Sequence, residues 1–322
     1  MEKQNWTLVE EFLLLGFSDH PEYGPWLFAV FLAVYTMTIL GNLIIMFIIC
    51  TDMQLHTPMY FFLGNLSFVD IFLSSVTIPK LLVTLISSNK TITFYSCFTQ
   101  LYCFITLGNM ENLLLAVMAI DRYVAICDPL RYYVVMSWQV CLWMVAGSWM
   151  LVSLHSLLHT VLTAHLSFCE SNLIRHFFCE MTPLLALSCS PTSTNQLVIY
   201  TEGSFSLALP FLLILFSYLL ILSSVLRIHS LKGKFQTMST CASHLTSVLL
   251  FYGTLFSIYF RPSSSHSLDQ DRIVSIMYTA ITPMMNPFIY SLRNKDLKAA
   301  LRRVICKKLL FFCQIQAHID TF

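Results

Sequence analysis

Charged side chains inside long apolar stretches are the residues of this sequence best placed to do chemistry. Asp70 and Glu111 each lie midway along such a stretch, Asp121 and Arg122 end one, and Glu202 lies near the start of another. A charge inside a membrane is costly unless it is paired or hydrated, so each position is a functional candidate. Asp70 and Glu111 indicate either a hydrogen-bonded pair that joins two helices or a hydrated, cation-binding interior. Arg122, taken alone, is typical of an arginine that reaches the membrane surface.

Two histidines have the spacing of a metal site. His155 and His159 lie four residues apart, which places both rings on one face of a helix. The neighbouring sequence supplies no carboxylate or third ligand, so we expect packing or a hydrogen bond there and no metal. The sequence also has no hydrolase elbow, phosphate loop or dinucleotide fingerprint, so we expect no enzyme.

The composition is that of a membrane protein. Of the 322 residues, 57% are hydrophobic and only 11% are charged, and the mean hydropathy is +0.71. A soluble domain carries about 25% charged residues, so most of this exterior must face lipid. A formal net charge of +1 gives no field that would attract nucleic acid, and we expect no nucleic-acid partner.

Seven apolar stretches each approach or exceed the roughly 20 residues that a helix needs to cross a bilayer. They lack the alternating pattern of a membrane barrel, so they predict an all-α membrane protein, a seven-transmembrane-helix bundle over 26–292. The bundle follows an N-terminal segment, 1–25, and precedes a tail, 293–322. The expected helices are 26–50, 58–82, 97–126, 140–162, 197–226, 239–260 and 272–292.

The distribution of Lys and Arg predicts the orientation of the bundle. With the N-terminus outside, the cytoplasmic segments hold twelve of these residues and the outer segments hold six. Because cytoplasmic loops carry the excess of basic residues, we expect an extracellular N-terminus and a cytoplasmic C-terminus. In the tail, basic and apolar residues alternate over 294–312, which predicts a short amphipathic helix on the membrane surface, in contact with anionic lipid.

Cysteines and glycosylation triplets fall on the expected outer side. Four cysteines in this oxidising environment could form two disulfides, and their spacing leaves three pairings open. They are Cys97, Cys169, Cys179 and Cys189. Asn5 begins a triplet for N-glycosylation that we expect to be used, and Asn89 begins a second whose use stays open.

Six short motifs follow one another along the expected helices. They are Gly41-Asn42, Pro58–Asp70, Met118–Cys127, Ser217-Tyr218, Ser239–Leu245 and Pro283–Asn294. Each pattern is weak alone, but the ordered set closely resembles that of the olfactory receptors, a branch of the rhodopsin-like (class A) G-protein-coupled receptors. The resemblance covers nearly the whole chain.

The resemblance implies an odorant receptor. Such a receptor binds a small, mostly hydrophobic volatile molecule within the helix bundle and activates a stimulatory heterotrimeric G protein, which raises cAMP. It lies in the plasma membrane, in the cilia of olfactory sensory neurons. The matching cavity positions are Phe104, Ile105, Gly108, Asn109, Glu202, Ser206, Tyr252, Leu255, Tyr259 and Thr279. Ordinary core packing is the alternative at each of these positions.

The resemblance also assigns roles outside the cavity. It pairs Cys97 with Cys179 and Cys169 with Cys189. It implies no cofactor, except that Asp70 and Glu111 match an interior site for a sodium ion. The residues matched to activation and G-protein coupling are Asp121, Arg122, Tyr123, Tyr218, His244, Asn286, Pro287 and Tyr290.

Other functions stay open at this point. Seven helices with Asp70 and Glu111 inside could translocate protons or other ions, and the same two carboxylates could serve an intramembrane hydrolase. A chemosensory receptor of the same family that acts outside olfaction would have the same sequence features.

Overall fold

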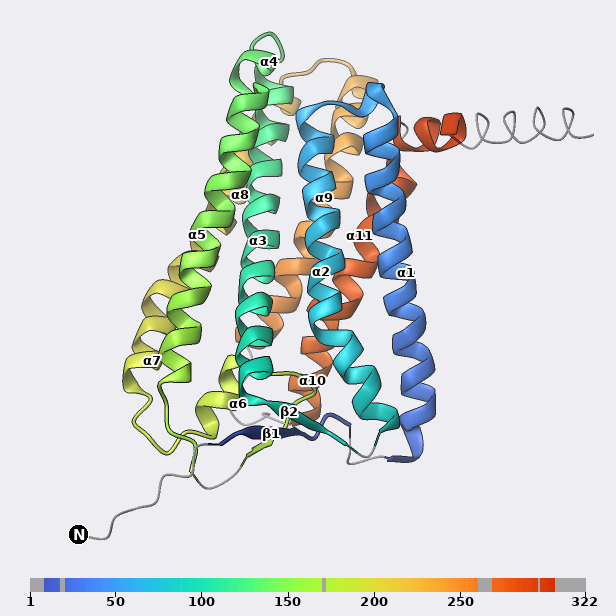
Figure 1. Cartoon of the computed structure of the whole chain (residues 1–322). Coiled ribbons are helices and arrows are strands. Elements are labelled where there is room, and N and C mark those ends of the chain that lie inside the picture. Colours follow the sequence, from blue (N-terminus) through green and yellow to red (C-terminus); the bar gives the residue numbers. More distant parts are fainter. Residues whose placement is uncertain are drawn as a thin grey trace, which may run out of the picture.

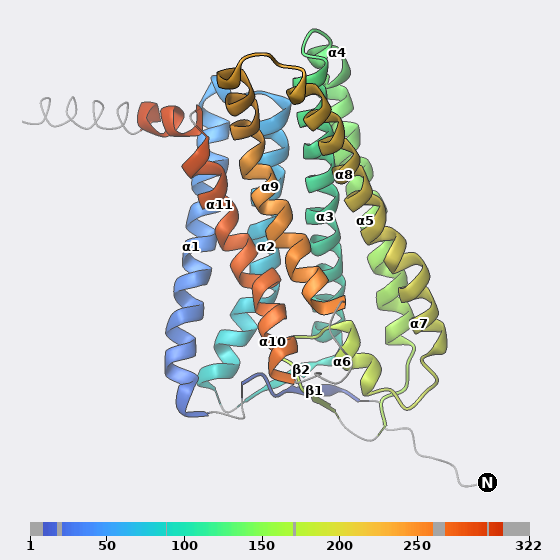
Figure 2. The same cartoon turned by 180° about the vertical axis from the view of Figure 1, so that it is seen from behind.

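The computed structural model describes residues 9–17, 21–87, 89–169, 172–259, 268–294 and 296–304. In these ranges long helices run side by side as a bundle (Figures 1 and 2). The helices are α1 (Gly24–Thr51), α2 (Pro58–Ile86), α3 (Phe94–Cys127), α5 (Trp138–Ala164), α7 (Ser193–Val198), α8 (Ser204–Leu226), α9 (Leu231–Tyr259), α10 (Leu268–Ile276) and α11 (Thr282–Arg293). A π-helical turn, η3 (Ile199–Gly203), joins α7 to α8, and a second, η5 (Met277–Ile281), joins α10 to α11.

The described part of the chain contains five helical segments that are long and apolar enough to cross a membrane. They are α1, α2, α3, α5 and the continuous segment Ser193–Leu226. Their outward faces carry large apolar side chains, such as Leu40 on α1 and Trp143 and Leu154 on α5, which are more than half exposed. An exterior of this kind is stable against lipid and not against water, so the chain is a multi-pass membrane protein.

As far as the described residues reach, the seven stretches expected from the sequence are helical, and most helices extend beyond the expected bounds. The largest difference is in α9, which begins at Leu231 and not at residue 239. The hydropathy signal did not include 231–238 because Lys232, Lys234 and Gln236 make this first part of the helix polar. A helix continues past the apolar region when its end lies outside the membrane.

A small three-stranded sheet closes one end of the bundle. β1 (Glu11–Leu14) pairs antiparallel with β2 (Thr91–Thr93) and parallel with β3 (Leu173–Ile174). We call this the sheet end; α6 (Met181–Ala186) also lies there, and α4 (Tyr132–Val135) lies at the opposite α4 end (Figure 1). The sequence did not predict these strands, because two to four residues are too few to show an alternating pattern.

The contact between α1 and α11 explains one of the sequence motifs. Pro287 has no N–H group, so the carbonyl of Pro283, four residues earlier, has no donor within α11. Asn42 supplies that donor through its side-chain amide, at 3.1 Å. The helices approach closely because Gly41 has no side chain: a Cβ built there would lie only 3.1 Å from Cβ of Pro287.

The start of the tail is helical over 296–304 and leaves the α4 end sideways (Figure 1). Leu297 and Ala300 are buried against the bundle, and Arg303 forms a salt bridge with Asp52 at 2.7 Å. The expected amphipathic helix over 294–312 therefore falls only partly within the described residues.

Candidate functional site

A cavity of about 680 Å³ lies inside the bundle and is lined by residues of α2, α3, α5, α6, α7, η3, α8, α9 and η5. Such a volume is typical of a site for one small molecule. Of the cavity positions implied by the sequence, the lining contains Phe104, Ile105, Gly108, Asn109, Ser206 and Leu255. Glu202, Tyr252 and Thr279 are not part of the lining, and the side chain of Tyr259 falls outside the described residues.

On the α3 side of the cavity, the lining includes one glycine, Gly108, and space is left beside it. Phe104, Gly108 and Asn112 follow one another at four-residue spacing, so they lie on the same face of the helix. A Cβ built at Gly108 would have no other atom within 4 Å. The absence of a side chain at Gly108 therefore leaves cavity space open and does not serve a close contact between helices.

Asn112, which the sequence reasoning missed, connects α3 to two other helices. Its amide nitrogen donates to the carbonyl of Ser206 at 3.2 Å, and its oxygen accepts a short hydrogen bond from the hydroxyl of Tyr252. The Ser206 carbonyl lacks a donor in α8, because residue 210, four positions later, is a proline. The four-residue spacing from Gly108 is the signal that could have identified Asn112.

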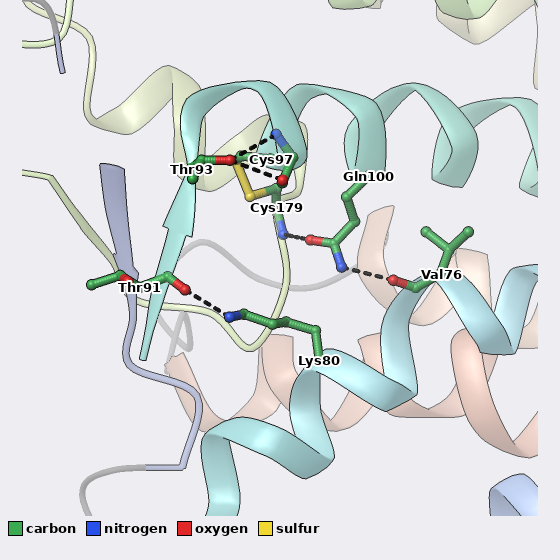
Figure 3. The surroundings of a disulfide bond; sticks show 8 residues. Val76, Lys80, Thr91, Thr93, Cys97, Gln100 and Cys179 are labelled. Atoms are coloured by element: carbon green, nitrogen blue, oxygen red, sulfur yellow. Dashed lines mark hydrogen bonds between the residues drawn. A yellow bond between two sulfur atoms is a disulfide. The ribbon is translucent and has the colours of Figure 1, made fainter. Parts of the chain in front are cut away.

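The loop before α7 is attached to α3 at the sheet end of the bundle. Disulfides join Cys97 to Cys179 and Cys169 to Cys189, which is the pairing implied by the resemblance. Gln100 strengthens the first connection, because its oxygen accepts from the N–H of Cys179 at 2.9 Å and its amide donates to the carbonyl of Val76 at 2.8 Å (Figure 3). The loop thus has fixed positions relative to both α2 and α3.

Two aromatic residues, Phe104 of α3 and Tyr278 of η5, and one acid from this loop, Glu180, also line the cavity. Phe104 packs edge-on against Phe178, with ring centroids 4.9 Å apart, and against Tyr278 at 5.6 Å. The carboxylate of Glu180 accepts a hydrogen bond from Tyr278 at 3.0 Å. Burial raises the pKa of Glu180 to about 7, although the hydrogen bonds from Tyr278 and Ser275 oppose this shift. The carboxyl group of Glu180 is therefore harder to ionise than a carboxyl group in water.

His176, next to this acid, is uncharged. Burial and the nearby Arg272 lower its pKa to about 3. Its Nε2 atom lies 3.2 Å from the Ser275 hydroxyl and 3.5 Å from the carboxylate of Glu180. Sequence patterns did not single out His176 or Glu180, because the residues that contact them come from η5 and α10, about a hundred residues later.

Glu202 lies between the two histidines of α5. Its carboxylate oxygens contact Nδ1 of His155 and Nε2 of His159, the latter at 2.9 Å. Both histidines line the cavity. The expected hydrogen bond is therefore present, but its acceptor is the carboxylate that the neighbouring sequence lacks. It comes from η3, more than forty residues away, and a local pattern cannot show it.

The interior acids lie between the cavity and the α4 end. Asn286 donates from its amide nitrogen to both carboxylate oxygens of Asp70, at 3.1 and 3.0 Å. Glu111 is buried and lines the cavity, close enough to Asp70 for the two groups to interact electrostatically. Within the described residues, the buried Asn286 Oδ1 atom has no hydrogen-bond partner. These hard oxygen atoms fit a small cation.

At the α4 end, Asp121 holds two partners. The Arg122 guanidinium lies 3.9 Å from one carboxylate oxygen of Asp121, and the Tyr132 hydroxyl donates to the other at 2.7 Å. Arg122 remains partly exposed, whereas Asp121 is buried. Tyr123 follows and packs, partly buried, against the core. Of this pair, Arg122 is thus the group that a partner outside the bundle could reach.

A chain of hydrogen bonds joins α3, α8 and α9 on the side of this pair that faces the sheet end. His244 of α9 donates from Nε2 to the carbonyl of Leu115 at 2.9 Å, which leaves Nδ1 to accept from the Tyr218 hydroxyl of α8 at 2.8 Å. Tyr290 on α11 is buried, and its hydroxyl is not hydrogen bonded among the described residues. Of the predicted activation residues, Asp121 thus contacts Arg122 and Tyr218 contacts His244, whereas Asn286 contacts Asp70 of the predicted ion site.

Comparisons with known proteins agree with the motifs. A family model described as "Olfactory receptor" matches residues 31–308. Among curated relatives, olfactory receptor 1f45 of Rattus norvegicus is 53% identical over 96% of this chain and 98% of its own length. Olfactory receptor 1E16 of Mus musculus is 51% identical over 96% of this chain and 98% of its own. Olfactory receptor 1F1 of Homo sapiens is 51% identical over 95% of this chain and 98% of its own.

Proposed function

Because the chain belongs to the olfactory receptor family, we propose that it binds a volatile odorant in the cavity between α3, α5, α8 and α9. The family consists of G-protein-coupled signalling receptors and not of enzymes. Binding of the odorant activates a stimulatory heterotrimeric G protein at the α4 end and raises cAMP. The sheet end faces the exterior, and the C-terminus lies in the cytoplasm.

The lining of the cavity is the observation that carries this proposal. Apolar side chains such as Phe104, Leu207 and Leu255 form much of the wall, and Asn109 and Asn112 add a few polar groups. A cavity of this kind favours a small, mostly hydrophobic molecule with one hydrogen-bonding group. The open space at Gly108 supports a ligand that reaches the α3 backbone.

Asn112 offers a physical route from the ligand to the helices. A ligand beside α3 changes the contacts of Asn112 and so acts on Tyr252 of α9 and Ser206 of α8. Farther along the same two helices, Tyr218 and His244 join α8 to α9 through one hydrogen bond. A shift of either helix changes this second connection, because both connections belong to the same helix pair.

The expected response at the α4 end is release of Arg122. In the structure the Asp121 carboxylate lies 3.9 Å from the Arg122 guanidinium and accepts a hydrogen bond from the Tyr132 hydroxyl at 2.7 Å. Movement of the helix ends would let the guanidinium leave Asp121 and bind a helix of the G protein. Tyr123, Tyr218, Pro287 and Tyr290 contribute to the same transition by packing next to the helices that move.

Asp70, Glu111 and Asn286 would hold a sodium ion in the receptor interior. The carboxylates would supply negative charge and Asn286 a neutral oxygen. The ion would stabilise the arrangement in which α2, α3 and α11 lie close together at these residues.

We place the receptor in the plasma membrane, in the cilia of olfactory sensory neurons. Asn89 is exposed at the sheet end, where an oligosaccharide could be attached, and its side-chain oxygen accepts from Thr91. Asn5, the other acceptor, lies outside the described residues. The basic helix at 296–304 lies where it would contact anionic lipid of the inner leaflet.

The proposal is tested by screening a chemically diverse odorant panel for cAMP in cells with verified surface expression. We expect at least one agonist, and we expect Asn112→Ala to weaken it more than Ser75→Ala, a hydroxyl on α2 away from the cavity. Loss of one hydrogen bond typically costs about 0.5–1.5 kcal/mol, or roughly a 2- to 13-fold loss of potency. Current or uptake without ligand would favour ion translocation and contradict the proposal.

A further inference from the structure

Three metal-binding side chains meet at the wall of the cavity. Nδ1 of His155, Nε2 of His159 and the Glu202 carboxylate all lie within 4.8 Å of one another. The two histidine side chains are 10% and 3% exposed, whereas Glu202 is 39% exposed. One buried and one mostly buried imidazole therefore contact one accessible carboxylate, and neither the family assignment nor the odorant cavity requires this arrangement.

The backbone holds these groups in place from two helical segments. The four-residue spacing on α5 places both rings on one face, with centroids 4.6 Å apart. Glu202 lies in the π-helical turn η3, and this wider turn changes which residues of the segment face α5. Such turns are frequent at functional sites. The next residue, Gly203, lines the cavity together with both histidines.

We propose that His155, His159 and Glu202 bind a zinc ion. Two neutral imidazoles and one carboxylate are the donor set of zinc sites that keep a fourth position open. Ca²⁺ and Mg²⁺ prefer oxygen ligands, so two nitrogen donors disfavour them. Zinc bonds to nitrogen and oxygen are about 2.0–2.2 Å long, so in a tetrahedral site two ligand atoms lie about 3.3–3.6 Å apart. The three ligand atoms, which lie within 4.8 Å of one another, would move closer together as the ion binds.

The ion would connect α5 to the turn η3, which leads into α8, next to the odorant cavity. It would replace the hydrogen bonds between Glu202 and the two rings with shorter metal bonds. Because both histidines line the cavity, the fourth position faces it. A water molecule or a nitrogen or sulfur atom of a bound molecule would occupy that position. This inference does not depend on which odorant the receptor binds or on its G protein.

Zinc binding to the purified full-length receptor tests the proposal. The receptor in detergent is freed of metal with a chelator and titrated with ZnCl₂, with zinc affinity and thermal unfolding as the readouts. We expect one equivalent to bind and to raise the unfolding temperature as zinc concentration increases. His155→Gln, His159→Gln and Glu202→Gln should each weaken binding by at least the roughly 10–100-fold that loss of an outer-shell partner causes. Three separate variants keep the test valid if one of them fails to fold.

Two further variants separate a metal site from a hydrogen-bonded cluster. Glu202→His would supply a third nitrogen ligand, so we expect it to recover zinc affinity to within about tenfold of the wild type, as in the three-histidine zinc sites. His165→Gln changes an exposed histidine next to the end of α5 and should leave binding unchanged. The proposal is wrong if the wild type shows no zinc binding at about 100 μM, a free energy of roughly −5.5 kcal/mol. Equal affinity of the wild type and the three glutamine variants would also overturn it.

Discussion

Replacing Gly108 with leucine tests the cavity most directly. Gly108 lines the cavity, and a Cβ at this position would have no neighbour within 4 Å. A leucine side chain would therefore extend into space that the odorant needs, without displacing an adjacent helix. The receptor without ligand should fold at least as well as the wild type, because glycine inside a helix costs about 0.8–1.0 kcal/mol relative to alanine.

The cost falls on the complex with odorant. Forcing extra methylene groups into a filled site typically costs about 1–3 kcal/mol. If only the bound state carries that cost, agonist potency falls by roughly 5- to 150-fold. All agonists that reach the α3 backbone should be affected, whatever their functional groups.

Surface-normalised dose–response curves for several agonists provide the measurement. Gly147→Leu is the matched control, since a Cβ at Gly147 on α5 also meets nothing within 4 Å but the residue does not line the cavity. Gly41→Ala is the opposite control: its Cβ would lie 3.1 Å from Pro287, so we expect less receptor at the surface. Unshifted curves for Gly108→Leu, at normal surface level, would refute the placement of the ligand.

Three further predictions concern the loop, the α4 end and pH. Cys97→Ser or Cys179→Ser should remove most surface receptor, because loss of a native disulfide typically costs about 2–5 kcal/mol; normal surface levels in both would contradict this. Arg122→Ala should keep surface expression and abolish odorant-evoked cAMP, and an unchanged dose–response curve would show that Arg122 is not the coupling group. Burial raises the pKa of Glu180 from 4.5 to about 7, so the folded receptor holds this proton more tightly than the unfolded chain does. This stabilisation is lost as pH rises through 7, so the unfolding temperature of the wild type should fall more between about pH 5 and 8 than that of Glu180→Gln. Identical pH profiles of the two proteins would exclude Glu180 as the cause.

The membrane helices and the family could be predicted from the sequence because both depend on local patterns. Apolar stretches near the length of a bilayer crossing indicate helices without any knowledge of their neighbours. The ordered motifs predicted the olfactory receptor family, and the family model and the relatives confirm it. Helical spacing places Phe104 and Gly108 on one face of α3, and the family resemblance predicted that this face lines the cavity.

The rest of the site depends on contacts between distant segments. Glu180 reaches the cavity through a loop whose path is set by the disulfide to α3 and by Gln100. The carboxylate beside His155 comes from a π-helical turn, and neither the turn nor the residue that it directs toward α5 has a known sequence pattern. Tyr252 was expected to face a ligand, but it is not a lining residue and contacts Asn112 instead. Helical spacing predicts which side chains share one face of a helix, but not how close each of them lies to a cavity.

Two prolines in membrane helices show how a local sequence feature leads to a contact between distant segments. Pro210 and Pro287 each leave the carbonyl four residues earlier without a donor in its own helix, and in both cases an asparagine from a neighbouring helix supplies one. Asn42 does so between α1 and α11, far from the cavity, where Gly41 allows close packing. Asn112 does so between α3 and α8 at the cavity wall, where a ligand can compete for it. The same backbone defect thus stabilises one contact and makes the other sensitive to the odorant, and the difference lies in what surrounds each asparagine.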